Sequence, residues 1–184
     1  MTRRPITKQD FLIFSETDME IFYRKATAAD LDEIEKLVAG AIARMIENGI
    51  YQWDELYPTR DDFADDIALD SLYVGETDGE ICIVFAINHN HDEEYADGNW
   101  TYDGENYLVV HRVCVRTEYQ RRGIADKTVD YIEKLIKDAG ADSIRLDTFT
   151  ENPFAIHMYE KHGFAIVGTM RLRKGLFYLF EKNL

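Results

Sequence analysis

The segment from Val113 to Ala125 constrains the fold most, because an apolar strand there runs directly into a basic loop and a helix. The apolar run over residues 106–116 predicts a buried strand, and the pattern from Gly123 to about Ala139 predicts an amphipathic helix. The loop between them holds Arg121 and Arg122. Free backbone N–H groups and the positive dipole end at a helix start suit a phosphate. A solvated basic loop before an ordinary helix is the alternative.

A second strand, residues 143–150, ends in polar residues and is followed by Asn152 and Pro153. Proline is favoured at the first position of a helix, so we expect a short helix over residues 153–162. Taken alone, Asn152 is an ordinary helix N-cap. Taken alone, Tyr159 in that helix is a core or interface aromatic.

The remaining patterns place these two segments in one domain. Alternating apolar residues predict the strands, and helical spacing predicts the helices. The expected strands are residues 19–26, 71–76, 80–88, 106–116, 143–150, 164–170 and 176–181, and the expected helices are 31–48, 59–69, 123–139 and 153–162. This order indicates an α/β fold with helices on the faces of one sheet. Residues 19–184 form the predicted domain, and residues 1–18 are expected to be an N-terminal appendage.

Charge and cysteine usage limit the partners and the compartment. Twenty-one Lys and Arg against 35 Asp and Glu give a net charge of −14. This charge argues against binding to nucleic acid or anionic membranes and leaves cationic partners such as amines. No apolar run approaches the roughly 20 residues of a membrane span. Cys82 and Cys114 lie in apolar strand-like runs, which favours reduced thiols and a cytoplasmic location.

The two strand–loop–helix segments together resemble the GNAT superfamily of acyl-CoA-dependent N-acetyltransferases. The run Gln120-x-x-Gly123-x-Ala125 is similar to the family's Gln/Arg-x-x-Gly-x-Gly/Ala pyrophosphate signature. The segment from Asn152 through Tyr159 to Phe164 is similar to its Asn…Ala…Tyr-Glu-Lys-x-Gly-Phe segment. The stretch around Gln52-Trp53-Asp54 and other short motifs look like an uncharacterised bacterial subgroup. A glycine that is frequent in the family's third strand is absent here.

The resemblance implies a mixed, mostly antiparallel sheet of about seven strands, splayed between the fourth and fifth strands and flanked by about four helices. Acetyl-CoA, as cosubstrate, would lie in the V between the splayed strands. Backbone N–H groups of the basic loop would hold its pyrophosphate, and the fourth strand would pair with the pantetheine arm and stabilise the oxyanion. The residues expected at acetyl-CoA are Val113, Cys114, Val115, Gln120, Arg121, Arg122, Gly123, Ile124, Ala125, Asn152 and Tyr159.

By the same resemblance, an amine attacks the thioester directly, and Tyr159 serves as the acid that protonates the leaving thiolate. Packing beneath the cofactor is its alternative role. Two residues are candidates for the base. His111 titrates near neutrality but is also a plausible core residue. Asp147 lies on the fifth strand, where it acts either as a base or as the partner of Arg112 or Arg145.

Strand parity bears on the histidine. In an uninterrupted strand, His111 shares its face with Val113 and Val115, whereas Arg112 and Cys114 point the other way. Cys114 has no adjacent histidine in the sequence, so we expect no covalent role for it.

Aromatic residues in the loops are candidates for the acceptor pocket. Trp53, Trp100 and Tyr107, with acidic neighbours such as Asp54, are expected to receive a cationic amine. The alternative is that the tryptophans seal loops onto the core. The His and acidic residues between His89 and Glu93 match no standard metal spacing, so no metal is expected.

The sequence therefore predicts an acetyl-CoA-dependent N-acetyltransferase that acts on a small-molecule amine. A non-catalytic CoA-binding or regulatory module with the same fold is the alternative. The apolar run from Leu176 to Phe180 is expected to be either a central strand or the edge of a homodimer.

Overall fold

The computed structural model of the chain describes residues 19–184. The predicted appendage, residues 1–18, lies outside the described residues. The strands are β1 Phe22–Lys25, β2 Leu72–Thr77, β3 Glu80–Asn88, β4 Tyr107–Val115, β5 Ser143–Phe149, β6 Ala165–Leu172 and β7 Gly175–Asn183. The α-helices are α1 Leu31–Glu47, α2 Arg60–Ala68, α3 Ile124–Asp138 and α4 Pro153–Lys161, and short 3-10 turns are η2 Ala28–Asp30, η3 Glu93–Asp97 and η4 Thr117–Tyr119. The predicted order of elements is confirmed.

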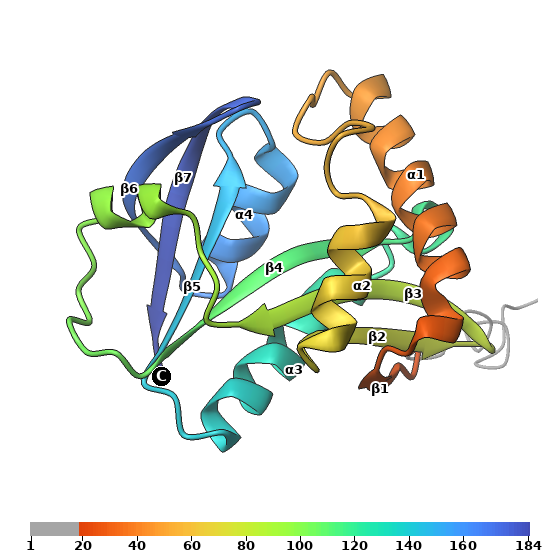
Figure 1. Cartoon of the computed structure of the whole chain (residues 1–184), viewed down its shortest axis with the longest axis horizontal. Helices are drawn as coiled ribbons and strands as arrows, with labels where there is room; N and C mark the ends of the chain where they lie inside the picture. Colours follow the sequence, from red (N-terminus) through yellow and green to blue (C-terminus); the bar gives the residue numbers. More distant parts are fainter. Residues whose placement is uncertain (1–18) are drawn as a thin grey trace, which may run out of the picture.

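The strands form one seven-stranded sheet in the order β1-β2-β3-β4-β5-β7-β6. Every neighbouring pair is antiparallel except β4 and β5, which run parallel. That pairing covers only Tyr107–Val109 against Ser143–Arg145, and beyond it the two strands diverge (Figure 1). The predicted splay between the fourth and fifth strands is therefore confirmed. β7 lies inside the sheet between β5 and β6, as the central-strand interpretation expected.

Helices cover both faces of the sheet (Figure 1). Apolar residues of α1 and α2 pack with β2 and β3 in one cluster, which includes Ile34, Phe63 and Cys114. Residues of α3 and α4 pack with β3, β5 and β7 in a second cluster, which includes Ile132 and Tyr159. Both cysteines are buried free thiols. No helix among residues 19–184 is long and apolar enough to span a bilayer.

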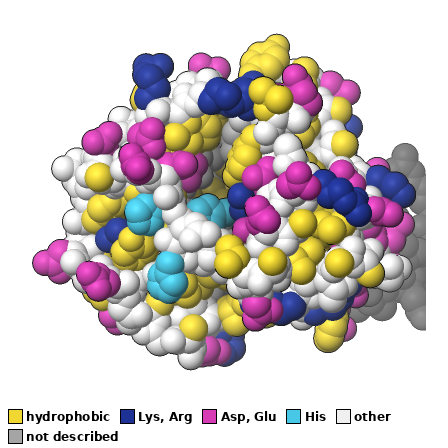
Figure 2. Space-filling view, in the orientation of Figure 1, with side chains coloured by type: hydrophobic (Ala, Val, Ile, Leu, Met, Phe, Trp, Pro, Cys, Tyr) yellow, Lys and Arg dark blue, Asp and Glu magenta, His cyan; other side chains and the backbone are white. Residues whose placement is uncertain are grey.

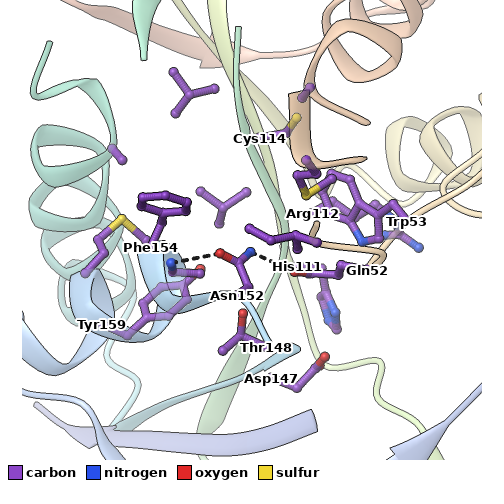
Figure 3. Close-up of a pocket in the computed structure, with 18 of the residues that line it drawn as sticks. Gln52, Trp53, His111, Arg112, Cys114, Asp147, Thr148, Asn152, Phe154 and Tyr159 are labelled. Carbon is purple, nitrogen blue, oxygen red and sulfur yellow. Dashed lines mark hydrogen bonds between the residues drawn. The ribbon is translucent and has the colours of Figure 1, made fainter. Parts of the chain in front are cut away.

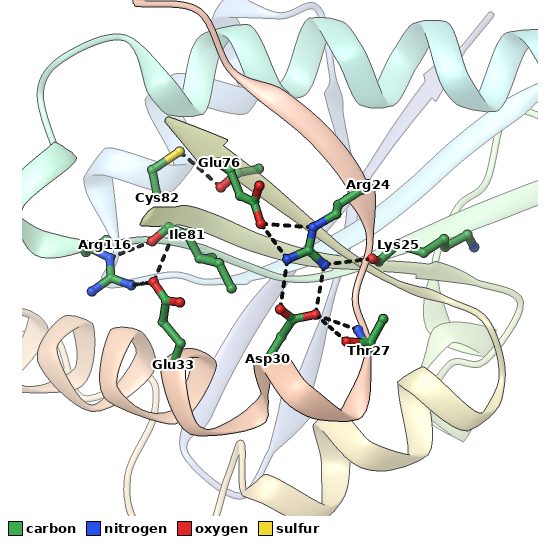
Figure 4. Close-up of polar contacts among 10 residues, drawn as sticks. Arg24, Lys25, Thr27, Asp30, Glu33, Glu76, Ile81, Cys82 and Arg116 are labelled. Atoms are coloured by element: carbon green, nitrogen blue, oxygen red, sulfur yellow. Dashed lines mark hydrogen bonds and ion pairs between the residues drawn. The ribbon is translucent and has the colours of Figure 1, made fainter. Parts of the chain in front are cut away.

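Polar contacts join β1 and the start of α1 to the neighbouring strands (Figure 4). The guanidinium of Arg24 on β1 binds Asp30 at 2.8 Å and also contacts Glu76 on β2. Asp30 in turn accepts a hydrogen bond from the backbone N–H of Thr27 at 2.7 Å, which completes a capping box. The adjacent guanidinium lowers the pKa of Asp30 to about 2. Further along α1, Glu33 holds Arg116 at 2.5 Å, which ties the helix to the end of β4.

A β-bulge interrupts β4 and changes which side chains share a face. Ala86 of β3 pairs with His111 and Val84 pairs with Cys114, so two residues of β4, Arg112 and Val113, stand opposite one residue of β3. Arg112 takes a positive φ of 54°, which is unusual for a side chain of its size.

The expected parity of β4 is therefore wrong. His111 lies opposite Ala86, which packs against α1 and α2, whereas Val113 packs in the cluster of α3 and α4. Arg112 reaches α2, on the same face as His111. The extra residue in the bulge reverses the alternation, so His111 and Val113 point to opposite faces.

Candidate active site

A cavity of about 1220 Å³ follows the opening between β4 and β5. It is lined by β4 from Val110 to Val115, by the loop that opens α3, by α4, by the α1–α2 loop and by the β6–β7 turn. Figure 2 shows it as a hollow in the middle of one face, with histidine side chains beside it. The divergence of two parallel strands thus creates the space in which the predicted residues meet.

The loop before α3 forms one end of the cavity. Gly123 is the N-cap of α3 and has a φ of +77°, a conformation that glycine adopts without strain. Arg121, Gly123, Ile124 and Ala125 line the cavity. The Gln120 side chain also lines it and donates a hydrogen bond to the carbonyl of Val115 at 3.2 Å.

Arg122 behaves differently from its neighbour in this loop. It is not among the residues that line the cavity, and its guanidinium lies 5.2 Å from the centroid of the Tyr119 ring. Thr117, for which the sequence offered no signal, does line the cavity, and its buried hydroxyl has no hydrogen-bond partner among residues 19–184.

The start of α4 forms the wall across from β4. Asn152 caps α4 by accepting a hydrogen bond from the backbone N–H of Ala155 at 3.2 Å. Its side-chain amide also donates to Oε1 of Gln52 at 2.9 Å, a contact drawn in Figure 3. Gln52 belongs to the α1–α2 loop, so this bond joins two walls of the cavity. Apart from the Gln52-Trp53-Asp54 motif, no local pattern in the sequence indicates this contact.

Tyr159 lies on α4 and lines the cavity (Figure 3). Its ring packs against Phe164 and Phe180, with centroids 5.6 and 5.8 Å away. Within the described part of the chain its hydroxyl makes no hydrogen bond. Burial raises the pKa of Tyr159 well above its ordinary value, so the phenol is protonated at neutral pH.

Asp147 on β5 points its carboxylate into the cavity region and accepts a hydrogen bond from the Tyr95 hydroxyl at 2.8 Å. Burial raises the pKa of Asp147 to about 6, against the opposing effect of the Tyr95 hydrogen bond. The two arginines that were its alternative partners are engaged elsewhere, Arg112 with Asp66 and Arg145 with Glu181.

His111 on β4 also lines the cavity. Burial, aided by the nearby charge of Arg112, lowers the pKa of His111 to about 4, and a hydrogen bond with the Asn90 backbone opposes the shift. The imidazole is therefore neutral at pH 7, and its buried Nε2 has no hydrogen-bond partner in the described part of the chain. The last pair between β4 and β5 is Val109 with Arg145. His111 lies two positions after Val109 on β4, and Asp147 lies two positions after Arg145 on β5. Residues paired in a parallel ladder point to the same face, so the two side chains flank the point of divergence.

Arg112 lines the cavity next to His111 and is held by α2. Its Nη1 lies 2.5 Å from a carboxylate oxygen of Asp66 on α2, and its guanidinium lies 5.4 Å from the centroid of the Tyr57 ring. The Asp66 side chain is buried, and burial raises the pKa of Asp66 despite the arginine.

The three aromatic residues predicted for the acceptor separate into two places. Trp53 lines the cavity. Trp100 and Tyr107 are not among the lining residues and enclose the guanidinium of Arg145, which lies 4.2 and 3.7 Å from their ring centroids. Among residues 19–184 no three His, Cys, Asp or Glu side chains are grouped to hold a metal ion.

Asp54 follows Trp53 in the α1–α2 loop and pairs with two cavity-lining cations. Its carboxylate binds Arg173 of the β6–β7 turn through both guanidinium nitrogens, at 2.6 and 2.7 Å, and Lys174 at 3.1 Å. These cations hold the pKa of Asp54 well below its usual range. Its charge is therefore already compensated by this chain, which the expectation of a free acidic neighbour did not include.

Comparison with known proteins gives a consistent result. The family model described as "Acetyltransferase (GNAT) family" matches residues 43–164. No curated protein matches the sequence. A crystal structure of a GNAT-family acetyltransferase from Streptococcus agalactiae is 29% identical, covers 89% of this chain and 95% of its own, and superimposes with a TM-score of 0.79.

Two further structures extend the likeness. A Staphylococcus aureus protein assigned as an acetyltransferase is 32% identical over 88% of this chain and 97% of its own, with a TM-score of 0.69. The YncA protein of Salmonella typhimurium, solved with its cofactor acetyl-CoA, shares the fold at 15% identity, 89% and 94% coverage and a TM-score of 0.65. The family match over most of the sheet, together with the splayed strands and the glycine loop, shows that this chain belongs to the GNAT family of acetyltransferases.

Proposed function

We propose that this enzyme transfers the acetyl group of acetyl-CoA to the amine of a small molecule. The observation that carries the proposal is that a single cavity joins the start of α3 to Asp147 and Tyr159. A cosubstrate held at one end by its pyrophosphate thus has its thioester between an acid and a base. We also propose that residues 19–184 form the acetyltransferase domain.

The residues at the α3 end fit a pyrophosphate. The first backbone N–H groups of α3 have no partners within the helix and carry the positive end of its dipole. A Cβ added to Gly123 would meet nothing within 4 Å, so there is open space beside the backbone. Arg121 adds a positive charge to the same wall.

The edge of β4 that faces β5 fits an extended pantetheine arm. Beyond Val109 this edge has no strand partner, because β5 has diverged. Backbone groups around Val113 are therefore available to pair with the amides of the arm as an added strand would, whereas the carbonyl of Val115 already accepts a hydrogen bond from Gln120. A backbone N–H there is also suited to stabilise the oxyanion that develops on the thioester carbonyl.

The proton transfers are assigned to Asp147 and Tyr159. Asp147, as a carboxylate, takes a proton from the acceptor ammonium, and the neutral nitrogen then attacks the carbonyl carbon. The C–S bond of the resulting adduct then breaks, and Tyr159 gives its proton to the departing thiolate. The nitrogen loses its second proton, which restores the Tyr159 phenol through solvent. The neutral His111 lines the cavity on the same face, and we assign its Nε2, which is buried and has no partner among the described residues, as a hydrogen-bond acceptor for the attacking amine.

Calorimetric titration with acetyl-CoA tests the cosubstrate part. We expect saturable binding to the wild type and its loss in Gly123→Asp, which puts a carboxylate where the pyrophosphate would lie. CoA release with a panel of small amines tests the acceptor part. Binding without turnover of any amine would favour a non-catalytic CoA-binding module. Reaction with peptide N-termini alone would overturn the small-molecule acceptor.

A further inference from the structure

The acceptor end of the cavity is lined by basic side chains as well as by carboxylates. Arg112, Arg173 and Lys174 line this end together with Asp66, Asp92 and Asp147. Arg112 is compensated by Asp66. The other two cations lie side by side in the β6–β7 turn and share one carboxylate, that of Asp54.

The hydrogen bonds to Asp54 leave N–H donors of the Lys174 ammonium without a partner among the described residues. Asp54 accepts two bonds from Arg173, one from Lys174 and one from the backbone N–H of Leu56 at 3.0 Å, which together match the four lone-pair sites of a carboxylate. An ammonium has three N–H donors, and within the described residues Lys174 uses one of them. The Lys174 side chain is 23% exposed and lines the cavity. The cluster of Asp54, Arg173 and Lys174 has a net charge of +1 at neutral pH.

We infer that the acceptor is an amine that also carries a carboxylate, and that Lys174 is the residue that binds this carboxylate. The inference rests on the proposed function and names the substrate class. A carboxylate seated there would accept the open N–H donors of Lys174 and balance the charge of the cluster. Charge-assisted hydrogen bonds of this kind are among the stronger polar contacts.

The strand register sets how far apart the two groups of the acceptor lie. Asp147 pairs with Leu179 on β7, and Lys174 precedes Leu179 by five residues. At the rise of a β-strand, the four residue steps from Gly175, where β7 begins, to Leu179 span roughly 13 Å, and Lys174 lies one residue further, in the turn. The long stem of Lys174 covers part of this distance, but the carboxylate still lies several bonds from the reacting nitrogen. The geometry thus points to an ω-amino acid rather than an α-amino acid bound by its α-carboxylate.

Matched acceptors that differ only in the carboxylate test the inference. With saturating acetyl-CoA, kcat/KM is measured for ε-aminocaproate against n-hexylamine and for γ-aminobutyrate against n-butylamine, using the full chain. We expect the wild type to prefer the carboxylated member of at least one pair by about tenfold. The preference should fall to near unity in Lys174→Gln and persist in Lys174→Arg, which keeps the charge.

Arg171→Gln is the matched control, because Arg171 is an exposed cation of the same hairpin that does not line the cavity. It should keep the preference. Caproate, which has the carboxylate without the amine, should inhibit the wild type competitively with ε-aminocaproate, a readout that needs no variant. Equal rates within both pairs, or a preference unchanged in Lys174→Gln, would overturn the inference while amine acetylation stands. Failure to bind acetyl-CoA and to acetylate any amine would instead overturn the proposed function itself.

Discussion

Asp147 is buried, which disfavours its ionised form and makes its carboxylate a stronger base. Burial raises the pKa of its carboxyl to about 6, while the hydrogen bond from Tyr95 limits the shift. A carboxylate with a pKa just below neutrality is ionised at pH 7 yet accepts a proton more readily than an exposed aspartate. The sequence identified Asp147 as a candidate but could not exclude an arginine partner, because ion pairing depends on side chains from distant elements.

A pH profile follows from this environment. The base acts when ionised, so kcat/KM should rise as pH increases through about 6 and then level off until the amine itself titrates. Asp147→Asn should lower kcat/KM by on the order of 100-fold and remove this limb. His111→Gln is the control, since the pKa of His111 is lowered to about 4 and its titration falls below the limb. A limb near pH 6 that survives in Asp147→Asn would exclude Asp147 as the base.

The two roles considered for Tyr159, proton donation and packing, are distinguished by removing its hydroxyl oxygen. Its ring packs against Phe164 and Phe180, so Tyr159→Phe keeps the packing and removes only the hydroxyl. If the phenol protonates the thiolate, kcat should fall by on the order of 100-fold while the affinity for acetyl-CoA, measured by calorimetry, stays the same. An unchanged kcat would leave Tyr159 with a packing role alone.

At the scale of the elements, the bulge in β4 is the feature that simple alternation could not anticipate. Period-two reasoning holds only in an uninterrupted strand, and one extra residue transfers every later side chain to the other face. The register shift depends on how β3 and α2 pack against β4, which a single sequence does not display. The same limit applies to Trp100 and Tyr107, whose placement depends on Arg145, a buried cation that lies more than forty residues along the chain from Trp100.

Substitutions at Arg112 separate the shape of the bulge from the ion pair that holds it. A positive φ is strained for alanine but not for glycine, whereas both substitutions remove the contact with Asp66. Arg112→Gly should therefore be more stable than Arg112→Ala by roughly 1 kcal/mol in chemical denaturation. Both variants should be less stable than the wild type, because Asp66 is left buried without its partner. Equal stabilities of the two variants would mean that the backbone at Arg112 relaxes out of the bulge.

At the scale of the whole molecule, sequence reasoning was most successful. The order of strands and helices follows from local periodicity and from capping and glycine signals. Each of these patterns lies within a window of about ten residues of the sequence. The cavity arises differently. It exists because β4 and β5 pair over three residues and then separate, leaving α3 with one strand and α4 with the other. The contact between Gln52 and Asn152, which bridges residues 100 positions apart, is a consequence of that geometry and has no local signature.

The divided sheet predicts how acetyl-CoA affects stability. A ligand that pairs with the open edge of β4 and contacts the starts of α3 and α4 binds only the folded chain, so it must raise the free energy of unfolding. At a concentration of 100 times Kd the increase should be about 2.7 kcal/mol, measured as a rise in Tm or in the denaturation midpoint. The acetyl thioester of N-acetylcysteamine has the thioester but no pyrophosphate, and at the same concentration it should have little effect. Equal stabilisation by both compounds would show that the loop around Gly123 does not hold the pyrophosphate.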